Sequence, residues 1–196
     1  MRNLVRASSA AVVLIAALAI GSPSEKPAAN TSAKPSANYE TATLAGGCFW
    51  SLQESLRHIP GVIKTTVGYT GGTVPNPTYE MVGTGNTGHA EAVQVIFDPA
   101  KLSYEELLNR FFQSHDPTSP RHQVNGMKVP YRSVIFYYSA GQRRIAERVK
   151  KEISQSGKWK YPVVTEITPA TKFYPAEARH QDYLQRISAH SCRLPD

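Results

Sequence analysis

The stretch YETATLAGGCFWSLQESLRH, residues 39–58, passes from an extended pattern through two glycines into a helical pattern. We expect a strand over Tyr39–Ala45 and a short helix over Phe49–His58, which the following Pro-Gly pair ends. Cys48 therefore lies where a helix begins, directly after a tight glycine turn. A strand, a turn and a helix in this order form the first unit of an α/β fold.

Seven further segments have the hydrophobic periodicity of regular structure. Strands are expected at residues 62–69, 91–97, 133–138 and 163–167, and helices after Ser103, after Ser139 and from Pro175 to about residue 188. The order β-α-β-β-α-β-α-β-α predicts an α/β (α+β) two-layer sandwich that resembles the ferredoxin-like split β-α-β unit. Two long loops, 73–88 and 116–130, interrupt the pattern, and loops of this length are usually functional.

Length, charge and cysteine count exclude several classes of protein and of function. A chain of 196 residues allows one domain and hardly two. The 22 basic and 15 acidic residues give a net charge of +7, but no dense run of Lys and Arg with interleaved aromatic residues indicates nucleic-acid binding. Two cysteines are too few for a disulfide-rich scaffold or a four-thiolate metal site.

The N-terminus has the three-part pattern of a secretory signal peptide. Residues 1–21 contain Arg2 and Arg6, then an apolar run, then small residues suited to cleavage. An uncleaved membrane anchor is the alternative, but the strongly apolar run 10–20 is short for a span of about 20 residues. Residues 22–38, rich in Ser, Pro, Ala and Lys, are expected to be a disordered linker. We therefore expect an exported protein, periplasmic or secreted.

Cys48 and Glu91 are the residues whose positions most favour chemistry. Backbone N–H groups and the positive end of the helix dipole are expected to lower the pKa of Cys48 from about 8.5, and the glycines let another molecule approach it. The alternative is an inert, buried cysteine. Phe49 and Trp50 are either core residues or the apolar wall of a pocket. Glu91 stands where a glycine-rich loop enters a strand, and a partly desolvated carboxyl there stays protonated and can act as an acid, unless it is a surface residue.

Two motifs in the same region are weaker than they look. GTGNTG at 83–88 matches the dinucleotide fingerprint, but a Pro/Asn-rich loop precedes it and an alternating strand follows it. His89-Ala90-Glu91 matches half of a zinc deaminase motif whose other half is missing. A metal site from His89, His115 and Asp116 would be an accident of folding. We therefore predict neither a metal nor a cofactor.

Cys192, near the C-terminus, has two interpretations. A structural disulfide to Cys48 would close a long loop and stabilise the fold by roughly 5 kcal/mol in the chain-entropy account. Alternatively, a cysteine on a mobile tail suits a resolving thiol, which must reach a partner, react and then be reduced.

Several short motifs recur in order at the spacing of one enzyme family. They are GCFW at 47–50, NPTY at 76–79, TGHAE at 87–91, HDPT at 115–118, YRS at 131–133 and the segment 173–181. On these motifs, from about residue 43 to residue 192, the chain resembles peptide methionine sulfoxide reductases of the A type. The resemblance implies a single catalytic domain over 39–196 with a mobile C-terminal tail.

The resemblance also implies a role for each motif residue. Cys48 would be the nucleophile that attacks the sulfoxide sulfur, and Glu91 would protonate or hydrogen-bond the sulfoxide oxygen. Tyr79 and Tyr131 would hold that oxygen with their hydroxyls. Phe49-Trp50 would form the apolar cradle for the methyl group of the oxidised methionine, which is either free or part of a protein.

The same resemblance implies the recycling step. Reduction would leave a sulfenic acid on Cys48, which Cys192 would convert to a disulfide for a thioredoxin-like reductant to attack. We expect a monomer. One departure from the family stands at Gly126, where members commonly have Asp in a run like Asn-Asp-x-Gly-Thr-Gln-Tyr, so no role for an acid is carried over. A thiol peroxidase and a non-catalytic exported domain with a structural disulfide remain alternatives.

Overall fold

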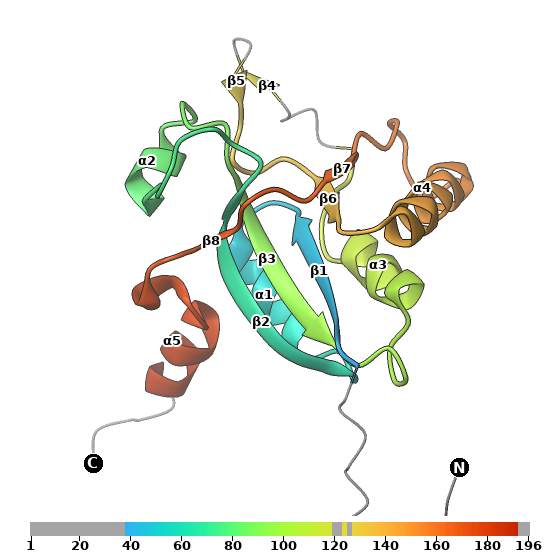
Figure 1. Ribbon diagram of the computed structural model, residues 1–196, viewed down its shortest axis with the longest axis horizontal. Helices are drawn as coiled ribbons and strands as arrows, with labels where there is room; N and C mark the ends of the chain where they lie inside the picture. Colours follow the sequence, from blue (N-terminus) through green and yellow to red (C-terminus); the bar gives the residue numbers. More distant parts are fainter. Residues whose placement is uncertain (1–37, 119–122, 125–126, 192–196) are drawn as a thin grey trace, which may run out of the picture. The chain divides into compact units, whose positions relative to one another are not determined.

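β1, which leads to the glycine turn and Cys48, lies inside a six-stranded sheet. The computed structural model describes residues 38–118, 123–124 and 127–191. Its elements are β1 (Glu40–Ala45), α1 (Phe49–Arg57), β2 (Val62–Thr70), α2 (Tyr79–Gly83), β3 (Ala90–Phe97), α3 (Tyr104–Gln113), β4 (Gln123–Val124), β5 (Met127–Lys128), β6 (Val134–Tyr137), α4 (Ala140–Gln155), β7 (Glu166–Pro169), β8 (Tyr174–Pro175), the 3-10 turn η1 (Ala178–His180) and α5 (Tyr183–Ser191). The order of strands in the sheet is β7-β6-β1-β3-β2-β8 (Figure 1).

The four middle strands confirm the predicted split β-α-β core. β3 lies between β1 and β2 and is antiparallel to both, while β6 is antiparallel to β1 on the other side. α1 connects β1 to β2 and crosses behind the sheet in Figure 1. β7 extends one edge in parallel with β6, and β8 extends the other antiparallel to β2. The fold is therefore the mixed α/β sandwich expected, with a strand added at each edge.

Side-chain caps set where the two longest helices begin. The hydroxyl of Ser103 accepts the N–H of Glu106 at 3.1 Å, and the hydroxyl of Ser139 accepts the N–H of Gln142 at 3.1 Å. Each bond satisfies an N–H that has no partner within the helix. The predicted starts of α3 and α4 are confirmed.

The C-terminal third differs from the prediction. β7 begins at Glu166 rather than at residue 163, and the last helix begins at Tyr183 rather than at Pro175. Pro175 instead pairs with Gly68 at the edge of the sheet, so strand pairing overrides the preference of proline for a first helical turn. The helix then continues to residue 191, into the part predicted to be an irregular tail.

Both predicted loops contain regular structure. α2 lies within residues 73–88, and the β4–β5 hairpin lies within residues 116–130. Within the described part of the chain, none of the helices combines the length and apolar character that a membrane span requires. The predicted signal peptide, residues 22–37 of the predicted linker, Gly126 and Cys192 lie outside the described residues.

Candidate active site

The turn before Cys48 needs both of its glycines, for different reasons. Gly47 has a φ of +84°, in the left-handed region that other residues rarely adopt. A Cβ on Gly46 would lie 2.9 Å from the rings of His115 and Phe111, because the chain itself packs closely there. The sequence suggested that the glycines make room for another molecule, but at Gly46 the space is taken by side chains of the protein itself. Cys48 then takes the N-cap position of α1 in an extended conformation.

The Cys48 side chain is a free, half-buried thiol. Burial raises the pKa of this thiol above its ordinary value, although the N–H groups of Trp50 and Ser51 favour the thiolate, and the charge of Glu91 raises the pKa further. The predicted lowering of the pKa is therefore wrong. A helix N-terminus favours a thiolate, but here desolvation outweighs it.

Glu91 reaches the same end of α1 from the neighbouring sheet. Its side chain lies on β3, is 3% exposed, and accepts the N–H of Phe49 through Oε2 at 3.0 Å. Burial raises the pKa of Glu91 to about 7, against the lowering effect of that N–H. A large fraction of this carboxyl therefore keeps its proton at neutral pH, and the expected desolvation is confirmed.

Tyr79 and Tyr131 bring two hydroxyls to this group. Tyr79 is the first residue of α2, and Tyr131 precedes β6 and is 43% exposed. Burial raises the pKa of both phenols, and the charges of Glu91 and Cys48 raise both further. These mutual effects mean that the thiol, the carboxyl and the two hydroxyls are electrostatically coupled.

An aromatic cluster forms one wall of the site. The Phe49 side chain is fully buried, and the ring of Trp50 stacks on Tyr79 at 5.9 Å and on Tyr183 at 4.2 Å. The ring of His180 lies 4.3 Å from that of Tyr79. Sequence reasoning assigned no role to His180 or Tyr183, although His180 lies in the matching segment 173–181 and Tyr183 follows three residues later.

A buried arginine joins the loop that precedes Glu91 to the loop that carries Tyr131. Arg132 is 2% exposed and donates to the carbonyl oxygens of Gly88 at 2.9 Å and Val129 at 3.0 Å. The N–H of Glu91 also donates to the carbonyl of Pro130 at 2.8 Å. The acid and the second tyrosine are therefore held on one rigid junction.

The two histidines considered for a metal site are engaged elsewhere. His89 accepts the N–H of Gly72 at Nδ1 and contacts the carbonyl oxygen of Val74 through Nε2 at 2.8 Å. The ring of His115 bonds the carbonyl of Phe111 and the hydroxyl of Ser133. Among residues 38–118, 123–124 and 127–191, no group of three His, Cys, Asp or Glu side chains is placed to hold a metal ion.

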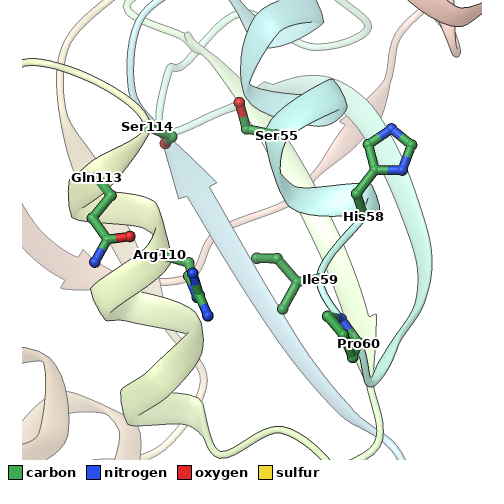
Figure 2. A pocket seen from close by; sticks show the side chains of 7 residues that line it. All are labelled: Ser55, His58, Ile59, Pro60, Arg110, Gln113 and Ser114. Atoms are coloured by element: carbon green, nitrogen blue, oxygen red, sulfur yellow. The ribbon is translucent and has the colours of Figure 1, made fainter.

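Surface pockets lie near α1 and α5 in the described part of the chain. The pocket in Figure 2 has a volume of about 370 Å³ and is at the end of α1 opposite Cys48; it is lined by Ser55, His58, Ile59, Pro60, Arg110, Gln113 and Ser114. A mainly apolar pocket of about 470 Å³ is lined by Arg179, Tyr183, Arg186 and Ile187. Because Tyr183 stacks on Trp50, this second pocket adjoins the aromatic wall.

The arrangement suits one type of chemistry. A thiol can attack a soft electrophilic centre, and a protonated carboxyl with two hydroxyls can stabilise and protonate an oxygen that leaves. The apolar wall selects a substrate group without charge.

Comparison with known sequences points to the same chemistry. A family model described as peptide methionine sulfoxide reductase matches residues 40–195. The chain is 48% identical over 159 residues to the peptide methionine sulfoxide reductase MsrA of Methanoculleus marisnigri, and this match covers 81% of this chain and 97% of the relative.

Solved structures agree with the sequence matches. Mxr1 from Saccharomyces cerevisiae in its reduced form is similar with a TM-score of 0.68 and 33% identity, over 76% of this chain and 85% of that chain. Mxr1 in complex with Trx2 is similar with a TM-score of 0.53 and 27% identity, over 79% of this chain and 91% of that chain. The chain therefore belongs to the peptide methionine sulfoxide reductase family, A type, and is an oxidoreductase.

Proposed function

We propose that this enzyme reduces methionine-S-sulfoxide, free or in proteins, to methionine through the thiol of Cys48. The observation that carries the mechanism is the pairing of that thiol with the largely buried carboxyl of Glu91 at one helix end. Family membership supports the reaction, and the coupled site supports the assignment of its steps.

Glu91 moves the proton in the first step. Its carboxyl donates a proton to the sulfoxide oxygen while the Cys48 sulfur attacks the sulfoxide sulfur. Because the pKa of Cys48 is raised, the attacking group starts as a thiol and must lose its proton during the attack. The Glu91 carboxylate that has just formed accepts that proton, so no external base is needed.

Oxygen transfer completes the reduction. The oxygen forms a bond to the Cys48 sulfur as its bond to the methionine sulfur breaks. The sulfur–sulfur bond that formed in the attack breaks in the same step, which leaves methionine and a sulfenic acid. Tyr79 and Tyr131 donate hydrogen bonds to the oxygen as its charge grows. Trp50, backed by the buried ring of Phe49, supplies the apolar surface on which the methyl group rests.

Recycling uses the second cysteine. The Cys192 thiol condenses with the sulfenic acid, which forms a disulfide and releases water, and two thiols of a thioredoxin then reduce that disulfide. The likeness to Mxr1 in complex with Trx2 supports a thioredoxin partner. Cys192 directly follows α5, whose Tyr183 stacks on Trp50.

Turnover of separate sulfoxide epimers tests the function. With a blocked methionine sulfoxide and dithiothreitol, we expect methionine only from the S epimer, and none when Cys48→Ser replaces the nucleophile. Turnover above a few per cent in Cys48→Ser, or equal use of both epimers, contradicts the assignment. Preferential consumption of hydrogen peroxide in competition with the sulfoxide favours a thiol peroxidase instead.

We also propose that the enzyme works outside the cytoplasm. The support is the charged, apolar and small-residue pattern of residues 1–21. N-terminal sequencing of the protein purified from its cells tests this, because an intact Met1 in cytoplasmic material contradicts export with cleavage.

A further inference from the structure

The segment that leads into α5 packs against the start of α2. Arg179 forms an ion pair with Glu80, and the ring of His180 stacks on that of Tyr79 at 4.3 Å. Glu177 adds a third contact, because its Oε1 accepts the backbone N–H of Tyr79 at 3.0 Å. All three contacts hold the first two residues of a helix that is only five residues long.

The second carboxylate oxygen of Glu177 binds a buried partner. Oε2 accepts the hydroxyl of Tyr69 at 2.9 Å, and Tyr69 lies on β2 with 0% exposure. The ring of Tyr69 in turn lies 5.9 Å from that of Phe49. One carboxylate therefore ties the start of α2 to a fixed point beneath the nucleophile helix.

Glu177 is ionised in this setting. Burial opposes its charge, but hydrogen bonds from the N–H groups of Tyr79 and of Glu177 itself and from the hydroxyl of Tyr69 favour it. Together with the charge of His180 they outweigh burial and hold the pKa of Glu177 below its ordinary value. Hydrogen bonds to an ionised acceptor are roughly twice as strong as neutral ones. The backbone of Tyr79 is therefore fixed by a strong bond, and its ring is fixed separately by the stack on His180.

We propose that Glu177 is a positioning residue that sets where the Tyr79 hydroxyl meets the sulfoxide oxygen. This inference rests on the proposed function, in which Tyr79 holds that oxygen. A misplacement of about 1 Å in a catalytic group can lower the rate about 100-fold. Loss of the Glu177 anchor frees the start of α2, and the hydroxyl that α2 carries moves with it.

Two substitutions at Glu177 separate geometry from charge. Glu177→Ala removes both bonds, and we expect kcat to fall by about 10- to 100-fold with little change in KM. In Glu177→Gln the side-chain carbonyl can still accept from the N–H of Tyr79 while the amide donates to the Tyr69 hydroxyl. We expect this variant to keep kcat within about threefold of wild type.

The decisive measurement is a double-mutant cycle with Tyr79→Phe, run with dithiothreitol so that recycling does not intervene. If Glu177 acts through the Tyr79 hydroxyl, Glu177→Ala lowers kcat by less than about threefold once that hydroxyl is absent. An equal loss in both backgrounds, or an unchanged kcat in Glu177→Ala alone, overturns the inference.

Stability needs a matched control, because Glu177→Ala leaves the buried Tyr69 hydroxyl without its acceptor. Tyr69→Phe removes that hydroxyl, so the double variant Tyr69→Phe/Glu177→Ala leaves no buried hydroxyl unpaired and should fold. Its kcat is compared with that of Tyr69→Phe alone. The same 10- to 100-fold loss is expected there, and no loss overturns the inference. A wild-type protein without turnover overturns the proposed function itself, which distinguishes the two failures.

Discussion

Glu91 is a carboxyl whose reactivity depends on its burial. It is 3% exposed, its pKa is raised to about 7 by desolvation, and its Oε2 accepts a hydrogen bond from the N–H of Phe49. A general acid is most effective when its pKa is close to the working pH. The position between a strand and the nucleophile helix thus converts an ordinary carboxyl into a neutral proton donor.

The pH dependence of the reaction follows from this pKa. The protonated form of Glu91 acts as the acid, and it is lost as pH rises through about 7. We expect kcat/KM of the wild type to fall above that pH. Glu91→Gln removes this fall and lowers the rate by about 100-fold, near the lower end of the usual contribution of general acid catalysis. Steady-state rates from pH 5 to pH 9 with dithiothreitol provide the check, with circular dichroism to confirm folding. A variant with the wild-type rate and profile contradicts the role.

At the scale of elements, α5 is held to α1 at its start. Asp182 has a φ of +54°, accepts from the Gln53 side chain at 3.0 Å and donates its N–H to the same side chain at 2.9 Å. Arg57 forms an ion pair with the Asp182 carboxylate. The helix that leads to Cys192 is therefore tied to the helix that Cys48 caps.

Release of this link should affect recycling more than reduction. Asp182→Gly keeps the left-handed backbone but removes both side-chain contacts, and we expect thioredoxin-driven turnover to fall by several-fold. The yield of methionine in a single turnover should stay at one equivalent, because the site around Cys48 is intact. Asp182→Asn is the matched control, since it retains an oxygen for Gln53 and tolerates the same φ.

Cys192→Ser should show the largest possible loss of thioredoxin-driven turnover, because it removes the resolving thiol itself. It should also give one equivalent of methionine and then stall with thioredoxin, because no disulfide forms for that reductant to attack. Dithiothreitol should restore part of its turnover. If Asp182→Gly loses the same fraction of its rate with both reductants, α5 does not serve recycling.

Sequence patterns predicted the helix starts that depend only on neighbouring residues. Ser103 and Ser139 each precede an amphipathic stretch, so the starts of α3 and α4 followed from capping alone. Pro175 was assigned to a helix because proline suits a first turn, but pairing with Gly68 on a distant strand takes precedence. No local pattern contains that partner.

The same contrast holds for the candidate site. The order of the motifs pointed to the residues that gather around Cys48. It did not predict that the pKa of Cys48 is raised, because that shift depends on burial that distant segments supply. His180 and Tyr183 were missed for a similar reason. Their rings face Trp50 only because the chain returns to α1 about 130 residues later.

At the scale of the whole molecule, Arg132 joins loops from distant parts of the sequence. It is 2% exposed, holds the carbonyls of Gly88 and Val129, and lies 3.9 Å from a carboxylate oxygen of Glu166. A buried acceptor that loses its donor costs about 1–3 kcal/mol. This single side chain therefore contributes to the cohesion of the sheet and its loops.

Arg132→Met should lower the free energy of unfolding by at least about 2 kcal/mol, because two carbonyls lose their donor. In Arg132→Lys the ammonium group can still reach one of these carbonyls. The free energy of unfolding of Arg132→Lys should therefore lie between those of Arg132→Met and the wild type. Urea denaturation followed by circular dichroism measures both. Stability equal to that of the wild type in Arg132→Met contradicts this account of the junction.

The return of the C-terminal segment to the first helix also orders events during synthesis. Glu177, His180 and Tyr183 complete the surroundings of Tyr79 and Trp50, and they lie about 130 residues after Cys48 in the sequence. A ribosome makes Cys48 long before it makes these residues. The nascent chain therefore carries its thiol before the C-terminal segment closes the aromatic wall, so the substrate-binding surface is finished only after synthesis has passed Tyr183.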